Sequence, residues 1–265
     1  MIRHKCYSSF ILYSSSFQTV KCGVPQGSVI GPLLFLIYVN DLPCASSFQT
    51  TLFADDTSLH LSHKDIKTLQ VNVQNELDKV DTWMRSHRLS INYNITAYMI
   101  ITTTRSQNCN FKISMNGVRI QQTDSTKYLG VISDNKLSWK PQISSLCGKL
   151  SQGCDVMCKI RHFADIKTLR LIYFILFHLH LQYCIIDWGR AYKVVIRPAQ
   201  VLQNQIVKYK TFSNRTSSAS NILKLLKILK VSDLHQLDLE KFVYKYNDDI
   251  LPSSFDNVFS KLYKW

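Results

Sequence analysis

The sequence predicts an α+β protein in which short strands and helices alternate in the first half and the second half is mostly helical. Two observations support this prediction. Up to about residue 133, apolar and polar residues alternate in short segments separated by turn-forming residues. From Pro141 to about Tyr246, apolar residues recur at three- and four-residue steps, as on one face of a helix. With 265 residues, 46% of them hydrophobic, the chain can form a sizeable core, which excludes wholesale disorder.

The first forty residues predict a hairpin, a loop and a helix. Polar and apolar positions alternate over 1–22, which is typical of an edge-like hairpin. Turn-forming residues gather over 22–28, and Pro32 then suits the first turn of a helix that continues to Val39. Since 33–39 is apolar on every side, we expect this helix to be buried.

Short elements continue to residue 133. The expected elements are two strands joined by a tight turn at 50–61, an amphipathic helix at 64–87, a strand at 97–103, a hairpin at 111–120 and a strand at 128–133. The hairpin has the strongest local signal, because Asn116-Gly117 stands between two alternating arms.

One later stretch, 171–186, resembles a membrane span in composition. It has 16 residues, fewer than the roughly 20 that a bilayer requires, and it contains His178, His180 and Gln182. We therefore expect a core helix. A membrane-surface module over 165–230 is a further alternative, but the Lys-rich run 224–230 is more typical of the solvated side of a packed helix.

The chain is strongly basic, with 32 Lys and Arg against 18 Asp and Glu and a formal net charge of +14. This charge indicates a polyanionic partner, either nucleic acid or an anionic membrane surface. The net charge is 0 over 1–62, +6 over 63–150 and +8 over 151–265. A bound polyanion is therefore expected to lie mainly against the later segments.

The eight cysteines show no paired spacing, and the N-terminus lacks an apolar run of signal-peptide length. We expect an intracellular protein with reduced thiols and no disulfide partner; the sequence does not distinguish nucleus from cytoplasm. Cys154, Cys158 and His162 would share one helical face and suggest a metal site, but a buried apolar face is the favoured interpretation.

Asp55 and Asp56 are the strongest candidates for chemistry. Adjacent carboxylates raise each other's pKa unless a cation compensates them, and hard oxygen ligands favour Mg²⁺. The alternative is structural, because Asp is common in turns, where its side chain bonds the local backbone.

Four motifs in order support the chemical alternative. They are GVPQGSVIGPLLFLIYVNDLP at 23–43, LFADDTSLH at 52–60, VDTWMRSHRLSIN at 80–92 and STKYLGVISDNKLSW at 125–139. With this order and spacing the chain resembles the reverse transcriptases of non-LTR retrotransposons, close to the jockey and CR1-like groups. A weaker match, QYCIIDWG with VLQNQIVKY, covers 182–209.

The resemblance implies a partial polymerase palm over 1–133 and a basic, mainly helical thumb and C-terminal region over 134–265. It implies an RNA-directed DNA polymerase of a mobile element, a nucleotidyltransferase that adds nucleotides to a primer 3′-hydroxyl with two Mg²⁺ ions. The implied partners are an RNA template, a DNA primer or RNA–DNA hybrid, and deoxynucleoside triphosphates, with no membrane.

The resemblance also assigns site residues. Asp55 and Asp56 match the catalytic, metal-binding hairpin, with Asp55 the principal ligand. The positions that match the nucleotide- and template-binding segments are Pro25, Gln26, Gly27, Ser28, Phe53 and Ala54. Tyr128, Leu129 and Gly130 match the hairpin that grips the primer end.

Two departures from the family pattern lead us to expect that this chain alone does not polymerise. Residues 1–40 hold no Asp or Glu, whereas the family has a third metal ligand before the Pro-Gln-Gly loop, and the fingers are also missing. Asp41 matches an ordinary helix-end Asp and is a poor substitute. Ile95 stands at or near the position of a family Lys that assists pyrophosphate departure.

Two hypotheses follow: a piece of an enzyme that is active when complete, or a non-catalytic relic that at most binds nucleic acid. Coding sequence upstream of Met1 distinguishes them. An in-frame strand with an Asp supports the first hypothesis, and an in-frame stop supports the second.

Overall fold

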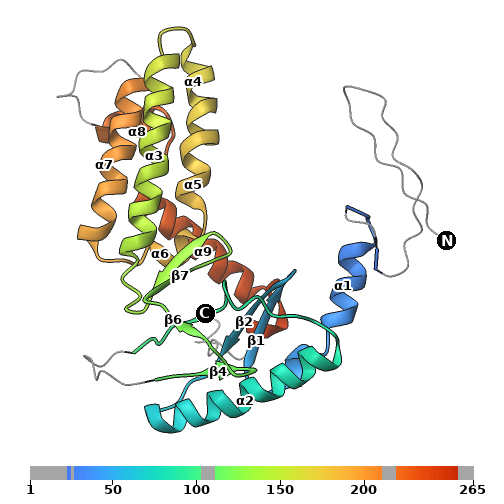
Figure 1. Ribbon diagram of the computed structural model, residues 1–265. Helices are drawn as coiled ribbons and strands as arrows, with labels where there is room; N and C mark the ends of the chain where they lie inside the picture. Colours follow the sequence, from blue (N-terminus) through green and yellow to red (C-terminus); the bar gives the residue numbers. More distant parts are fainter. Residues whose placement is uncertain (1–22, 25–26, 103–110, 211–218, 256–265) are drawn as a thin grey trace. The chain divides into compact units, whose positions relative to one another are not determined.

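The computed structural model describes residues 23–24, 27–102, 111–210 and 219–255 (Figure 1). These residues form two compact units. The first unit holds the described residues up to Tyr98 together with 111–121. The second holds 99–102 and the described residues from Gln122 onward. The predicted α+β class with a mostly helical second half is confirmed.

The first unit combines two helices with short strands. Its elements are α1 (Gly31–Val39), a 3-10 turn η1 (Leu42–Cys44), β1 (Gln49–Phe53), β2 (Asp56–His60), α2 (Ile66–Ser86), β3 (Ala97–Tyr98), β4 (Ser114–Met115) and β5 (Val118–Arg119). β6 (Gln121–Gln122) lies at the boundary between the units. Two antiparallel hairpins, β1–β2 and β4–β5, are thereby confirmed.

Helix α2 organises this unit. Asp65 caps its N-terminus by accepting a hydrogen bond of 2.7 Å from the Thr68 amide. On its apolar face, Leu77 and Val80 are buried. The Gln74 side chain bonds β4 as a neighbouring strand would, since its Nε2 donates to the Ser114 carbonyl and its Oε1 accepts from the Ser114 amide, at 2.8 and 3.0 Å.

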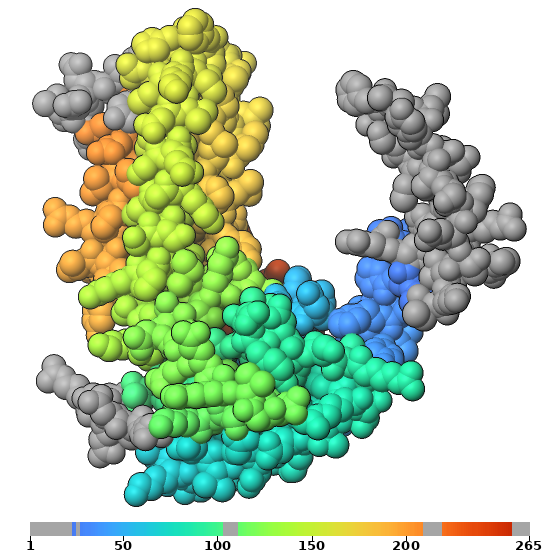
Figure 2. All heavy atoms as spheres, viewed as in Figure 1, coloured from blue at the N-terminus to red at the C-terminus, as the bar shows by residue number. Residues whose placement is uncertain are grey.

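The predicted burial of helix α1 is wrong. The helix forms and Pro32 lies in its first turn, but Leu33, Leu36 and Ile37 are 58%, 52% and 65% exposed. Figure 2 shows the side chains of this blue helix at the surface of the molecule. Only Val39, its last residue, is buried. An apolar helix becomes buried only where another surface covers it, and no described element covers this one.

The second unit begins with an antiparallel hairpin and continues with helices. Its elements are β7 (Ser125–Tyr128), β8 (Val131–Asp134), α3 (Lys140–Ile160), α4 (Ile166–Tyr173), a π-helical turn η2 (Phe174–His178), α5 (Leu179–Gln182), α6 (Ile185–Trp188), α7 (Lys193–Lys210), α8 (Ala219–Leu225), α9 (Val231–Asn247) and a 3-10 turn η3 (Ser253–Phe255). Figure 1 shows α3 between α7 and the α4–α5 segment.

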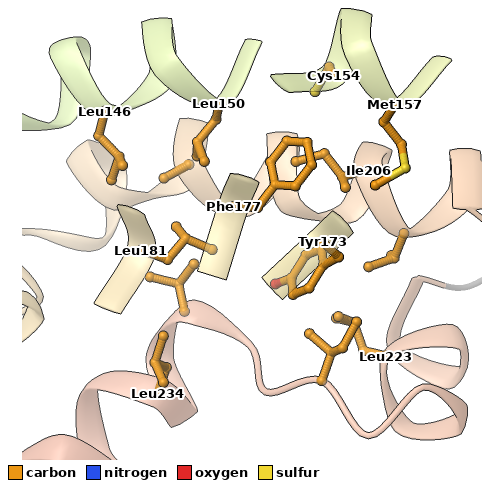
Figure 3. Close-up of a cluster of buried hydrophobic side chains, with 14 of the residues drawn as sticks. Leu146, Leu150, Cys154, Met157, Tyr173, Phe177, Leu181, Ile206, Leu223 and Leu234 are labelled. Atoms are coloured by element: carbon orange, nitrogen blue, oxygen red, sulfur yellow. The ribbon is translucent and has the colours of Figure 1, made fainter. Parts of the chain in front are cut away.

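The core of this unit is built around the predicted core helix. Tyr173, Phe177 and Leu181 recur at four-residue steps and are all 0% exposed. Figure 3 shows them between the α3 side chains Leu150 and Met157 and residues of later helices. The expected core helix at 171–186 is thus confirmed, although a π-helical turn and a break divide it. Among the described helices, none is long and apolar enough to cross a membrane.

Three other predictions have different outcomes. The strand expected at 97–103 covers only Ala97–Tyr98, and residue 103 lies outside the described part. The strand expected at 128–133 is wrong as a single strand, because Leu129 and Gly130 have positive φ and turn the chain between β7 and β8. The hairpin expected at 1–22 lies outside the described residues.

Candidate functional site

The acidic pair lies at the tip of the β1–β2 hairpin. Phe53 pairs with Asp56, so Ala54 and Asp55 form a two-residue turn. Ala54 has a φ of +50°, a left-handed conformation that L-residues adopt at a cost. Phe53, Ala54, Asp55 and Asp56 are all exposed. The hairpin therefore presents two consecutive carboxylates to solvent.

In the described part of the chain, no cationic side chain compensates these carboxylates. Within the described residues, neither Asp55 nor Asp56 forms an ion pair or a side-chain hydrogen bond. Two adjacent uncompensated carboxylates repel each other, and a divalent cation between or beside them would remove that cost. An Asp that served only the local turn would instead bond the backbone through its side chain.

The loop before α1 provides the second group of predicted site residues. Gly27 has a φ of +82°, which favours glycine, and a Cβ added there would meet no atom within 4 Å. Ser28 Oγ accepts a hydrogen bond of 3.0 Å from the Gly31 amide at the start of α1. Pro25 and Gln26 lie outside the described residues. Among those described, no hydrogen bond or ion pair joins Gly27 or Ser28 to the acidic pair.

The predicted primer-grip residues form the turn of the β7–β8 hairpin in the second unit. Tyr128 pairs with Val131, and Leu129 and Gly130 between them have φ of 46° and 85°. Positive φ at both central positions is typical of a type I′ turn, which matches the twist of the flanking strands. Gly130 adopts this conformation freely, whereas Leu129 requires support from its surroundings.

Comparison with known proteins shows which family has these sequence motifs. A sequence model of the reverse transcriptase (RNA-dependent DNA polymerase) family matches residues 2–133. The chain is 27% identical over 202 residues to a probable RNA-directed DNA polymerase from transposon BS of Drosophila melanogaster, covering 72% of this chain and 22% of that protein. It is 25% identical over 260 residues to the RNA-directed DNA polymerase from mobile element jockey of the same species, covering 89% and 27%.

The chain belongs to the reverse transcriptases of jockey-like mobile elements. The jockey polymerase of Drosophila funebris is 31% identical over 140 residues, which cover half of this chain and 15% of that protein. The chain spans about a quarter of the length of the first two relatives. No solved structure matches it. Members of the reverse transcriptase family act on nucleic acid templates and nucleotides and generally use divalent metal ions.

Asp41, the first acidic residue in the sequence, has structural contacts. Its carboxylate accepts a hydrogen bond of 3.3 Å from Trp83 Nε1 and lies 3.8 Å from His87 Nε2. The Trp83 and His87 rings stack with centroids 3.9 Å apart. The Tyr38 hydroxyl of α1 donates a hydrogen bond to the His87 carbonyl. Asp41 thus helps to fasten the end of α1 to α2, a role that depends on residues more than 40 positions later and that no local pattern predicts.

One further acid, Asp134, and one thiol, Cys154, also have structural roles. Burial opposes ionisation of Asp134, but hydrogen bonds from the Ser138 and Trp139 amides hold the pKa of its carboxyl below the usual value. Cys154 lies in the helical core, where desolvation, with a contribution from Cys158, raises its pKa to about 11. A neutral buried thiol is a poor metal ligand, because the thiolate is the form that binds metal.

The donor set fits a divalent cation in kind but is small in number. Exposed carboxylate oxygens are what Mg²⁺ prefers, and Asp55 and Asp56 supply them. Across the described ranges, no group of three or more His, Cys, Asp and Glu side chains could hold a metal ion. Ile95, which the sequence predicts to lie at or near the position of a family Lys, is 80% exposed, and its side chain offers no proton to a leaving group.

Proposed function

We propose that this chain supplies part of the palm, over 1–133, and the thumb, over 134–265, of an RNA-directed DNA polymerase. The observation that carries the proposal is the exposed and uncompensated Asp55–Asp56 pair at the tip of the β1–β2 hairpin. The motifs around this hairpin agree with the polymerase family, and the net charge of +14 suits a polyanionic partner.

The reaction proposed for the complete protein is attack of a primer 3′-hydroxyl on the α-phosphorus of a deoxynucleoside triphosphate, with pyrophosphate leaving. Asp55 and Asp56 would hold Mg²⁺, which when bound stabilises the attacking and leaving oxygens. Gly27 would allow the backbone to approach the nucleotide closely, with Pro25, Gln26 and Ser28 beside the template base. Tyr128, Leu129 and Gly130 would lie against the primer end.

Metal binding at the hairpin can be tested with Mn²⁺ as the probe. We expect the chain bound to a primer–template to bind Mn²⁺ through Asp55 and Asp56, because these carboxylates have no side-chain partner among the described residues. The matched control is Asp248 and Asp249, a second adjacent and exposed pair at the end of α9. Electron paramagnetic resonance should show Mn²⁺ release after joint replacement of Asp55 and Asp56 by Asn. An equal release after the same change at 248 and 249 would contradict the assignment.

A non-catalytic nucleic-acid-binding protein is the second candidate, favoured by Ile95, whose side chain cannot donate a proton to departing pyrophosphate. Both candidates predict binding that weakens with salt, because log K falls by about 0.9 for each phosphate neutralised on duplex DNA. Primer extension separates them. We expect no extension of a DNA primer on an RNA template by residues 1–265 with Mg²⁺. Extension that disappears in Asp55→Asn would establish that the chain is an enzyme by itself.

A further inference from the structure

The segment after the core helix has an unusual backbone. Helix α5 ends at Gln182, Tyr183 then has a ψ of 115°, and Cys184 has a φ of +51°. A left-handed conformation is unfavourable for a non-glycine residue, so surrounding contacts must hold it. This segment lies in the stretch QYCIIDWG, for which the sequence analysis predicts no chemical role.

The backbone of Tyr183 is held by the core of the second unit. Its carbonyl accepts a hydrogen bond of 2.9 Å from Trp188 Nε1, and its amide donates to the Leu179 carbonyl at 3.1 Å. Trp188 is 0% exposed and Ile185 is 1% exposed. The buried indole therefore fixes the point at which the chain leaves the core helix.

The side chain of Tyr183 points from this fixed point to the β7–β8 turn. Its hydroxyl donates a hydrogen bond to the Leu129 carbonyl, 54 residues away in sequence. Its ring faces Gly130 closely, since a Cβ added to Gly130 would lie 3.5 Å from Tyr183 Cε1. Tyr183 is 51% exposed, so the contact lies at the surface of the unit. All three residues belong to the second unit.

We propose that Tyr183 is a positioning residue of the primer site. A two-stranded hairpin is marginally stable by itself, and Leu129 has a φ that a leucine rarely adopts. The Tyr183 hydroxyl holds the strained turn in place before a primer arrives, which lowers the conformational entropy lost on binding. Tyr183 acts through the turn and not on the reacting atoms. This inference rests on the proposed function, in which the turn lies against the primer end.

The test compares Tyr183→Phe, which removes only the hydroxyl, with Tyr192→Phe as a matched control. Tyr192 lies on the loop before α7 in the same unit and is 82% exposed. Fluorescence anisotropy gives the affinity of the 265-residue chain for a recessed primer–template and for a blunt duplex of equal length. The fluorescence of a 2-aminopurine at the primer 3′ end reports directly on contact with the terminal base.

We expect Tyr183→Phe to lower the preference for the recessed end by about 3–10-fold, the range for losing one hydrogen bond. The affinity of Tyr183→Phe for the blunt duplex and its thermal stability should equal those of the wild type. Tyr192→Phe should match the wild type in every measurement. The terminal 2-aminopurine signal should move toward that of the free primer.

Three results would overturn the inference, and they differ in meaning. If the wild-type chain shows no preference for a recessed end, the proposed primer site itself fails. If the wild type has the preference and Tyr183→Phe retains it, the turn does not depend on the hydroxyl. Equal loss of affinity for both duplexes in Tyr183→Phe would mean that Tyr183 supports the thumb in general and not the primer end.

Discussion

Two helical segments of this chain have similar apolar compositions and opposite environments. In α1, Leu33, Leu36 and Ile37 are more than half exposed, whereas Tyr173 and Phe177 in the α4–α5 segment are fully buried. The difference lies in their neighbours. Helices α3 and α7 pack against the second segment within one unit, and no described element covers α1. The apolar content of a helix determines how much its burial would stabilise the fold. Whether the helix is buried depends on a neighbouring surface that packs against it.

The largest expected effect comes from Phe177. Its ring stacks with Tyr173 at 5.8 Å between centroids and lies close to Gly153 of α3. Replacing Phe177 by Ala leaves a cavity in the core and should lower the free energy of unfolding by about 3–5 kcal/mol. Urea unfolding followed by circular dichroism measures the change. A loss below about 1 kcal/mol would mean that the core helix is no better packed than α1.

A smaller effect is expected from the titration of Tyr173. Desolvation by burial raises its pKa to about 12, whereas an unfolded tyrosine titrates near 10. Because the unfolded chain loses its phenol proton first, the free energy of unfolding should fall by about 2–3 kcal/mol as the pH rises from about 10 to about 12. Below this range the contribution is constant. Urea unfolding across this pH range should show a smaller fall in Tyr173→Phe, and an identical fall would contradict burial of the phenol.

The smallest effect is expected on α1. Replacing Ile37, which is 65% exposed, by Lys should change the free energy of unfolding by less than about 0.5 kcal/mol. Ile37→Ala serves as the control for loss of the side chain without a new charge. A loss of stability in Ile37→Lys as large as that in Phe177→Ala would show that the face of α1 is covered in solution, and the comparison between the two segments would fail.

Elements with strong local signals were predictable from the sequence. Asp65 is an N-cap before a periodic apolar pattern, and Asn116-Gly117 adopts positive φ at both positions, so α2 and the β4–β5 hairpin follow from nearby residues. Leu129 gives no such signal, because leucine disfavours positive φ. Its turn is held by Tyr183, 54 residues later in the chain, and such long-range support is not visible in a local pattern.

Some features of the candidate site were also predictable from local sequence, and others were not. The tight acidic turn at Asp55 and Asp56 was predictable, because apolar strand residues flank it on both sides. The structural role of Asp41 was not, since it depends on Trp83 and His87 from another helix. The places of Pro25 and Gln26 stay predictions, because these residues lie outside the described part of the chain.

The side-chain amide of Gln203 in α7 affects the alignment of the helices as well as their stability. Gln203 is 0% exposed, and its Nε2 donates to the Tyr173 hydroxyl at 2.9 Å and to the Leu229 carbonyl at 2.8 Å. Its Oε1 accepts from Gln200, whose own Oε1 accepts from the Val231 amide. Helices that pack only through apolar side chains can shift along each other by one turn. Here such a shift would leave these buried polar atoms without hydrogen-bond partners, at a cost of roughly 1–3 kcal/mol each. The glutamine pair thereby selects a single axial alignment of the helices.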